Sequence, residues 1–258
     1  MVDKKPVVLV MAGHDPSGGA GIQADIETIA RNNCHAATVI TALTTQNTSE
    51  FIKSISVNPD DFQEQINLIL AEMQIKSCKI GLIADLGILS IIEKTLYSLK
   101  NIPIVIDPVI NAGSGEKMMT DDITVSLYEK LMPFTTVITP NSIEARKLTG
   151  MDSLEAAAAE FHKRGCTAVL ITGTHEQTEK VVNTLFLKNE TPLSNEWDRL
   201  PGNYHGSGCT LASAIAAQLA LGRDIKQSVS TAQEYTWQTL KHGVLLGKTQ
   251  IHPDRFYK

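Results

Sequence analysis

The chain has 258 residues, of which 43% are hydrophobic and 20% charged, a composition typical of a folded globular protein rather than a disordered one. Its formal net charge of -5 offers no basic stripe for a phosphate backbone, so we expect no nucleic-acid partner. No apolar stretch approaches the roughly 18 residues that cross a bilayer, so we expect no membrane partner and a cytoplasmic location. The length fits one domain over residues 1–258.

The sequence contains four cysteines, which lie far apart and form neither a C-x-x-C pair nor a tight cluster with histidine. This spacing favours four reduced thiols and argues against a zinc site or a disulfide framework. The cysteines are Cys34, Cys78, Cys166 and Cys209.

Short apolar runs rich in Val and Ile recur along the first two thirds of the chain, and their hydrophobicity is continuous rather than alternating. Such runs are typical of strands that are buried on both faces of a parallel sheet. They span residues 7–12, 36–43, 77–83, 102–107, 135–139 and 167–172. Segments with helical spacing alternate with them, at residues 21–32, 59–73, 85–99, 121–132, 141–149 and 153–164. The alternation predicts a doubly wound α/β fold, with a mostly parallel sheet flanked by helices.

The pattern changes in the last third of the chain. Residues 180–190 and 193–200 indicate a late hairpin or a pair of edge strands. Two long helices are then predicted, over residues 207–221 and 225–242. No repeat, low-complexity tract or linker divides the sequence.

A glycine-rich stretch, "AGHDPSGGAGIQAD" at residues 12–25, follows the first predicted strand. Gly19, Gly21 and Ala24 formally fit the dinucleotide fingerprint G-x-G-x-x-A. However, these glycines begin about six residues after the strand, and no acidic residue for a ribose ends the second strand. The stretch therefore favours a loop whose backbone approaches a small ligand. Asp25, one turn into the next helix, either reaches the same cavity or is a solvated helix carboxylate.

A second phosphate-binding motif is suggested by "LGKT" at residues 246–249. A Walker A motif needs four residues between its first glycine and the Gly-Lys pair, and Gly243 leaves only three. We reject this interpretation, since the stretch also follows a predicted helix rather than a strand.

Two polar stretches begin predicted helices. In "TPNSIEA", residues 139–145, Asn141 and Glu144 follow a strand and lie where ligands gather in a parallel sheet, but they would equally suit a helix cap. In "GSGC", residues 206–209, the glycine turn and the helix N-terminus form a natural anion cradle. A cysteine in a first helical turn tends to have a lowered pKa, although Cys209 could also be a small buried core residue.

Taken together and in this order, six segments resemble the hydroxymethylpyrimidine / phosphomethylpyrimidine kinase family of the ribokinase-like small-molecule kinases. The segments are "AGHDPSGGAGIQADI" (12–26), "VITALTTQNT" (39–48), "KIGLI" (79–83), "VIDPV" (105–109), "VITPNSIEA" (137–145) and "HGSGCTLASAIAA" (205–217). The resemblance spans nearly the whole chain. It implies a ribokinase-like three-layer sandwich, ATP and Mg²⁺ as cofactors, a homodimer, and phosphorylation of a pyrimidine alcohol or its monophosphate in thiamin biosynthesis.

The resemblance also assigns site residues. It implies a pyrimidine pocket with Leu82 as an apolar wall, and its other lining residues are Gly13, Asp25, Gln46 and Val109. An amide such as that of Gln46 can both donate to and accept from an aminopyrimidine edge. On the phosphate side it implies an anion hole formed by Gly206, Ser207 and Gly208, with Cys209 as general base. It also implies that Asn141 and Glu144 place Mg²⁺ and phosphate, with Asp107 as a further carboxylate at the metal.

The sequence departs from the family pattern at several positions. Gly113 and Thr172 stand where the family has lysines that face the triphosphate, so Thr172 falls within the nucleotide site. His14 replaces a small hydroxyl residue and Tyr204 replaces a threonine. Two alternatives therefore stay open: a pyridoxal or pyridoxine kinase, which shares the cradle and the thiol, and a non-catalytic pyrimidine-binding relative. His205 has a loop position typical of a structural histidine and receives no catalytic assignment.

Overall fold

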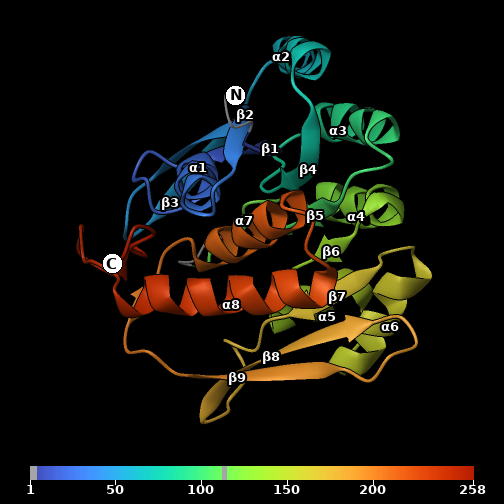
Figure 1. Cartoon of the computed structure of the whole chain (residues 1–258). Helices are drawn as coiled ribbons and strands as arrows, with labels where there is room; N and C mark the ends of the chain where they lie inside the picture. The colour runs from blue at the N-terminus through green and yellow to red at the C-terminus, as the bar shows by residue number, and fades with distance from the viewer. Residues whose placement is uncertain (1–4, 112–114) are drawn as a thin grey trace.

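The computed structural model describes residues 5–111 and 115–258, and these residues form one large sheet covered by helices on both faces (Figure 1). Within the described residues the sheet has nine strands, in the order β3-β2-β1-β4-β5-β6-β7-β8-β9. Their bounds are Val7–His14 (β1), His35–Gln46 (β2), Phe51–Ser56 (β3), Ile75–Ile80 (β4), Ile104–Ile106 (β5), Val137–Ile138 (β6), Ala168–Ile171 (β7), Lys180–Leu187 (β8) and Leu193–Asp198 (β9).

The central part of the sheet is parallel, because β2, β1, β4, β5, β6 and β7 all run the same way. Antiparallel strands close both edges: β3 pairs with β2 on one side, and the β8–β9 hairpin follows β7 on the other. A separate small ladder joins β10 (Asn203–Tyr204) to β11 (Gln250–Ile251) in parallel.

Eight α-helices of the described chain lie on the two faces of the sheet, and a short 3₁₀ helix spans Met132–Phe134. They are α1 (Gly21–Arg31), α2 (Pro59–Glu72), α3 (Leu86–Ser98), α4 (Asp121–Lys130), α5 (Ser142–Thr149), α6 (Leu154–Lys163), α7 (Ser207–Ala220) and α8 (Ile225–Lys241). No helix in the part of the chain that the structure describes is long and apolar enough to span a membrane.

Alternate residues of β1 divide the core into two layers. Leu9 and Met11 belong to the cluster that includes α2, α3, α4, α5 and α6, whereas Val8 and Val10 belong to the cluster that includes α1, α7 and α8. Successive side chains of a strand point to opposite faces of the sheet, so a strand that is apolar throughout must be covered on both. The predicted doubly wound, mostly parallel fold is confirmed.

The predicted elements agree with the observed ones to within a few residues, including the late hairpin and the last two long helices. The sequence reasoning missed β3, whose residues Ile52 and Ile55 are exposed, because an edge strand of this kind has no continuous apolar run. It also missed the two-residue strands β10 and β11, which are too short to leave a pattern. All four cysteines are free and buried.

Candidate active site

A cavity of about 700 Å³ opens at the carboxyl ends of the parallel strands. Its wall includes His14 at the end of β1, Leu82 after β4, Asp107 and Val109 after β5, and Thr172 after β7. In doubly wound sheets this edge is where the loops that bind ligands converge. The cavity is therefore the place in this fold where a small-molecule site is expected.

Most residues that the sequence singled out line this one cavity, although up to 196 positions separate them along the chain. They are Gly13, Gln46, Leu82, Asp107, Val109, Asn141, Glu144, Thr172, Gly206, Ser207, Gly208 and Cys209. Asp25 is the exception, and Gly113 lies outside the described residues.

The expectation that Asp25 lines the pyrimidine pocket is wrong. Its side chain is fully buried beneath the cavity, where its two carboxylate oxygens accept hydrogen bonds from Lys79 Nζ at 2.9 and 3.0 Å. Ser213 Oγ of α7 donates a third at 2.6 Å. Neither is Asp25 a solvated helix carboxylate, since α1 turns this position toward the sheet. Burial alone would lower the pKa of Lys79, but the charge of Asp25 raises it above its usual value.

Cys209 occupies the first turn of α7 and faces the cavity with only 9% of its surface exposed. The sequence suggested a lowered thiol pKa, and this is wrong: burial raises the pKa of Cys209 to about 12. Lys79 pulls it down, whereas the charges of Asp107 and Asp25 push it up. The helix N-terminus favours a thiolate, but here it does not compensate for the loss of hydration. The thiol is therefore neutral at pH 7 in the ligand-free protein.

Two buried carboxyl groups face the same part of the cavity. Asp107 is 5% exposed, and its Oδ2 has no hydrogen-bond partner among the described residues. Burial raises the pKa of Asp107, and the charge of Lys79 opposes this rise. The pKa of Glu144 is raised to about 8 by burial, with a further contribution from the charge of Asp107. Two desolvated carboxyl groups, one with an unsatisfied oxygen, fit the hard oxygen ligands that Mg²⁺ prefers.

Asn141 and Glu144 also cap α5, as the alternative interpretation of the sequence required. Asn141 Oδ1 accepts from the backbone N–H of Glu144 at 2.9 Å, and Glu144 Oε2 accepts from that of Asn141 at 3.0 Å, which together form a capping box. The backbone N–H of Ile110 donates to Glu144 Oε1 at 3.3 Å. These bonds fix the Glu144 carboxyl at the cavity wall. The same residues therefore cap the helix and line the cavity, so the two interpretations are compatible.

The glycine turn before α7 forms another part of the cavity wall, next to Asp107. Gly206 is the N-cap and has a φ of 73°, and a Cβ there would lie 2.0 Å from the carbonyl oxygen of Gly19. Only glycine permits both this backbone conformation and this approach to the glycine-rich loop. At Gly208 a Cβ would lie 3.5 Å from Asp107 Oδ1, so the turn opens toward that carboxylate. The free N–H groups of the first turn and the helix dipole make this wall suitable for an anion.

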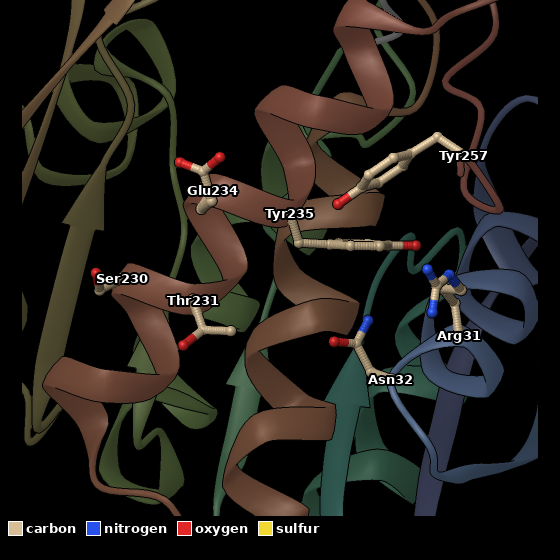
Figure 2. Close-up of a pocket in the computed structure, with 7 residues that line it drawn as sticks. All are labelled: Arg31, Asn32, Ser230, Thr231, Glu234, Tyr235 and Tyr257. Carbon is tan, nitrogen blue, oxygen red and sulfur yellow. The ribbon is translucent and has the colours of Figure 1, made fainter.

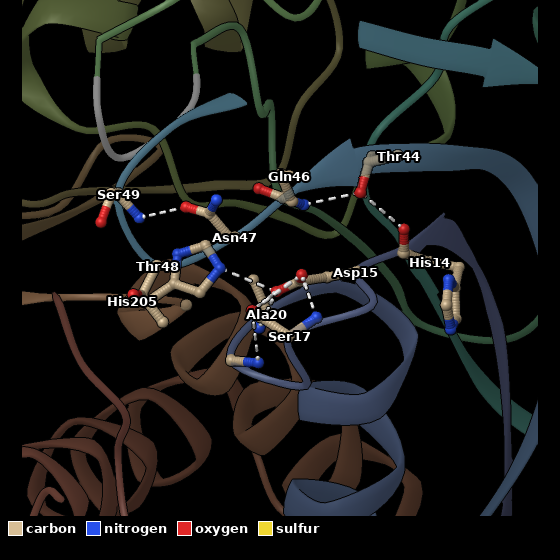
Figure 3. Close-up of polar contacts among 12 residues, drawn as sticks. His14, Asp15, Ser17, Ala20, Thr44, Gln46, Asn47, Thr48, Ser49 and His205 are labelled. Carbon is tan, nitrogen blue, oxygen red and sulfur yellow. Dashed lines mark hydrogen bonds and ion pairs between the residues drawn. The ribbon is translucent and has the colours of Figure 1, made fainter. Parts of the chain in front are cut away.

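His205, which the sequence left as a structural residue, makes a polar contact at the same turn. His205 Nε2 and Asp15 Oδ2 are hydrogen-bonded at 2.7 Å, and both side chains are buried at the cavity (Figure 3). Asp15 also accepts from the backbone N–H groups of Ser17 and Ala20, both at 2.9 Å. The pair thus ties the glycine-rich loop to the residue before Gly206. No local signal could reveal a contact between residues 190 positions apart.

Gln46 also lines the cavity, and its side-chain amide is held in place. Its Nε2 donates to Thr44 Oγ1 at 2.7 Å, and Thr44 Oγ1 in turn donates to the carbonyl of His14 at 2.8 Å (Figure 3). This chain of bonds fixes the amide against β1.

The cavity lining also includes an aromatic pair that the sequence reasoning missed. The ring centroids of Trp197 in β9 and Trp237 in α8 lie 6.1 Å apart, and Trp197 Nε1 donates to Gln233 Oε1 at 3.3 Å. Only the packing of the late hairpin against α8 brings these residues together.

A helix N-terminus suited to an anion, two buried carboxyl groups and a thiol meet at the carboxyl edge of this sheet. The fold and this set of groups are those of a ribokinase-like phosphotransferase that acts on a small molecule. The chain matches the family model described as phosphomethylpyrimidine kinase over residues 15–254, and it belongs to that family.

Comparison with known proteins agrees with this assignment. The chain is 33% identical to a hydroxymethylpyrimidine/phosphomethylpyrimidine kinase of Synechococcus elongatus, over 98% of each chain. Among solved structures it resembles a pyridoxal kinase of Bacillus subtilis in complex with ADP, with a TM-score of 0.88, 30% identity and 98% of each chain covered. It also resembles a phosphomethylpyrimidine kinase of Clostridium difficile, with a TM-score of 0.80, 30% identity, and 92% and 100% of the two chains covered.

Proposed function

We propose that the protein transfers the γ-phosphoryl group of ATP to hydroxymethylpyrimidine, to its monophosphate, or to both, as a step of thiamin biosynthesis. One observation carries the proposal: the Gln46 amide, the Cys209 thiol and the glycine turn at 206–208 line a single cavity. An amide for a pyrimidine edge, a proton acceptor and an anion cradle are what such a transfer needs in one place. Relatives named as hydroxymethylpyrimidine/phosphomethylpyrimidine kinases support the choice of substrate.

In the proposed reaction the substrate hydroxyl oxygen forms a bond to the γ-phosphorus while the bond from that phosphorus to the leaving oxygen of ADP breaks. Backbone N–H groups of residues 206–208 donate to the oxygens of the transferring group. Cys209 first loses its own proton to solvent, and the thiolate then takes the hydroxyl proton. Mg²⁺, for which Asp107 and Glu144 are suitable ligands, would neutralise phosphate charge when bound. The negative charge of Asp107 contributes to the raised pKa of Cys209, whereas the positive charge of Lys79 opposes it. A cation that neutralises Asp107 would therefore favour the Cys209 thiolate.

The remaining residues orient the substrates. Gln46, braced by Thr44, is suited to hold the pyrimidine edge, while Leu82, Val109 and the backbone at Gly13 give it a flat apolar wall. Thr172 and Asn141 are suited to contact the nucleotide phosphates. Asp25 has a different task in this proposal, which is to hold Lys79 at the cavity wall.

The experiment is a coupled ADP-release assay with hydroxymethylpyrimidine, its monophosphate and pyridoxal, each run with Mg²⁺ and with EDTA. We expect Mg²⁺-dependent turnover and a kcat/KM for a pyrimidine at least about tenfold above that for pyridoxal, equivalent to about 1.4 kcal/mol. Cys209→Ala should lose about 10² to 10⁴ in kcat, the usual contribution of a general base, with pyrimidine binding by calorimetry retained. Absence of turnover with both pyrimidines in the wild type would refute the proposal.

A second candidate, pyridoxine or pyridoxal phosphorylation, is favoured by a specific comparison. The chain is 32% identical to a pyridoxine kinase of Bacillus subtilis, over 93% of this chain and 92% of that one. A kcat/KM that favours pyridoxal in the same assay would establish this alternative. Ligand binding without turnover on any of the three substrates would instead support a non-catalytic role.

We also propose that the protein is a cytoplasmic homodimer. The antiparallel edge of the sheet supports dimerisation, because Leu43, Ile52 and Ile55 of β2 and β3 are 46%, 63% and 50% exposed. Apolar side chains gathered on an exposed edge strand are typical of a surface that pairs with another chain. Light scattering of the wild type and of Ile52→Lys tests the dimer: a wild-type mass of one chain would refute it, and the variant should weaken it.

A further inference from the structure

The residues after α8 form a C-terminal strap, residues 243–257, that runs back to the glycine turn. Its strand β11 pairs with β10, and the backbone N–H of His205 donates to the carbonyl of Ile251 at 2.9 Å. Two reciprocal backbone bonds between Val244 and His252, at 2.8 and 2.9 Å, close the strap on itself. The chain that enters the glycine turn is thus paired with the strap directly before Gly206.

Arg255 is the residue through which the strap reaches the turn. Its side chain is 2% exposed, and its guanidinium donates three hydrogen bonds. Nη2 donates to the carbonyl of Gly19, Nε donates to Thr210 Oγ1 at 3.0 Å, and Nη1 donates to Glu27 Oε2 at 3.0 Å. Arg255 itself does not line the cavity.

Two of these acceptors belong to the two walls of the anion cradle. Gly19 lies in the glycine-rich loop, and Thr210 lies in the first turn of α7. Thr210 Oγ1 connects Arg255 to the glycine turn, because it also donates to the carbonyl of Gly206 at 2.9 Å. Gly206 in turn packs against the carbonyl oxygen of Gly19. One guanidinium therefore fixes both loops at the place where they touch.

The strap is anchored on both sides of Arg255. Tyr235 Oη of α8 donates to the carbonyl of Arg255 at 2.9 Å, and the backbone N–H of Asp254 donates to the carbonyl of Thr239 at 3.0 Å. Figure 2 shows Tyr257 facing Tyr235 across the groove beside α8, and their ring centroids lie 6.1 Å apart. The backbone that carries the guanidinium is therefore fixed as well.

The position of Arg255 is not what helix stability alone would select. A cation beside a helix N-terminus opposes the helix dipole, which favours anions there. Burying an arginine is also costly unless its fork of donors is well paired. The planar fork meets two loops at fixed angles, which a flexible ammonium cannot do. A positioning task accounts for this placement.

We propose that Arg255 is a positioning residue for phosphoryl transfer, which sets the spacing between the glycine-rich loop and the glycine turn at residues 206–208. This inference rests on the proposed kinase function. Misplacing a catalytic group by about 1 Å can cost about 10² in rate. Loss of the fork should therefore lower kcat more than it weakens binding of either substrate.

The kinetic test compares Arg255→Met and Arg255→Lys with the wild type and with Glu27→Gln, which removes only the outer ion-pair partner. We expect kcat to fall by about 10- to 100-fold in Arg255→Met, and by at least about fivefold in Arg255→Lys, which keeps the charge but not the fork. KM for ATP and for the pyrimidine should change by less than about threefold. Glu27→Gln should keep kcat within about twofold.

A structural readout on the ligand-free protein accompanies the kinetics. Hydrogen exchange at the backbone amides of residues 206–210 should be at least about tenfold faster in Arg255→Met than in the wild type, since amide protection follows local opening. Glu27→Gln should leave it unchanged. Thermal unfolding shows whether each variant is folded at the assay temperature. If Arg255→Met is unfolded there, Thr210→Val, which breaks the same contact with a nearly isosteric side chain, replaces it in both tests.

The outcomes separate the two proposals. A wild type without turnover refutes the kinase function, whatever the variants do. A wild type with turnover, together with an Arg255→Met that is folded and has wild-type kcat or wild-type exchange at residues 206–210, refutes the positioning role of Arg255. Equal rises in both KM values at constant kcat would also refute it, because the residue would then only support binding.

Discussion

Lys79 Nζ lies 2.9 Å from Asp25 Oδ1, and both side chains are fully buried, with Lys79 at the cavity wall and Asp25 behind it. Ser213 Oγ completes the shell around the carboxylate. Burial raises the pKa of Cys209 and of Asp107, and the charge of Lys79 opposes both rises, so this ion pair is electrostatically coupled to the cavity. In a buried ion pair each charge is stabilised by the other rather than by water. Removing one of the two side chains therefore leaves an uncompensated buried charge.

Replacing Asp25 by Asn should therefore act on stability before it acts on substrate binding. The change keeps the shape but leaves the Lys79 ammonium unpaired, which costs about 3–5 kcal/mol in the free energy of unfolding, measured by urea denaturation. Ser213→Ala is the matched control, since it removes one hydrogen bond to the same carboxylate and should cost about 1–3 kcal/mol. If Asp25→Asn is instead as stable as the wild type and its KM for the pyrimidine is tenfold higher, Asp25 contacts the substrate.

Substitutions in the glycine turn should separate folding from phosphate binding. Gly206→Ala places a Cβ 2.0 Å from the carbonyl of Gly19 at a φ of 73°, so we expect a loss of at least about 2 kcal/mol in stability and no turnover. Gly208→Ala meets only Asp107, at 3.5 Å, so it should fold normally but obstruct the cradle, raising the KM for ATP by at least about tenfold. Unfolding curves and steady-state kinetics measure the two effects.

A control for backbone strain is available at the other end of α7. Gly222 also has a positive φ, of 83°, but a Cβ there meets no atom within 4 Å. Gly222→Ala should cost about 1 kcal/mol and leave kcat unchanged. If Gly208→Ala behaves like Gly222→Ala in the kinetic assay, the turn at residues 206–208 does not hold the phosphates.

The sequence predicts those parts of the site that are local. Continuous apolar runs predict the parallel sheet, and the strand ends then place Asp107 and Thr172 at one edge of it. The glycine turn before α7 is equally local, because three successive residues and a helix start define it. These features need no knowledge of distant contacts, so pattern reasoning is sufficient to find them.

The features that the sequence does not predict depend on tertiary packing. Asp25 is buried because α1 turns it toward Lys79, and the amphipathic pattern of α1 does not distinguish this charged position from a solvated one. His205 and Arg255 meet the glycine-rich loop from positions 190 and 236 residues away. The raised pKa of Cys209 has the same origin, since desolvation is set by everything packed around the thiol.

Glu144 should give the metal-free protein a pH-dependent stability. Its pKa is raised from 4.5 to about 8, chiefly by burial, so the folded state holds this proton more tightly than the unfolded state. The resulting stabilisation is fully present below about pH 4.5 and is lost as the pH rises to about 8. In EDTA, the difference in unfolding free energy between wild type and Glu144→Gln should fall with pH over this window, by at most about 1.4 kcal/mol per unit. A constant difference would show that the pKa of Glu144 is the same in the folded and unfolded states.

Restoring a cation at Thr172 should strengthen nucleotide binding. Thr172 is half-buried at the cavity wall. Two backbone hydrogen bonds of 3.0 Å fix it beside the start of α5: the N–H of Ser142 donates to the carbonyl of Thr172, and the N–H of Thr172 donates to the carbonyl of Pro140. Because only the side chain faces the cavity, Thr172→Lys should leave the fold intact and reach the phosphates. We expect the KM for ATP to fall about fivefold, the equivalent of about 1 kcal/mol, and the KM for the pyrimidine to stay constant.

The gain at Thr172 should also weaken with ionic strength, because it arises from a charge that salt screens. Thr174→Lys is the matched control: it adds the same charge two residues away, on the same cavity wall but at an exposed position. If both variants lower the KM for ATP equally, the effect is a general attraction of the triphosphate to positive charge. If Thr172→Lys alone does so, position 172 contacts the nucleotide, at a place where the family pattern has a cation that this chain lacks.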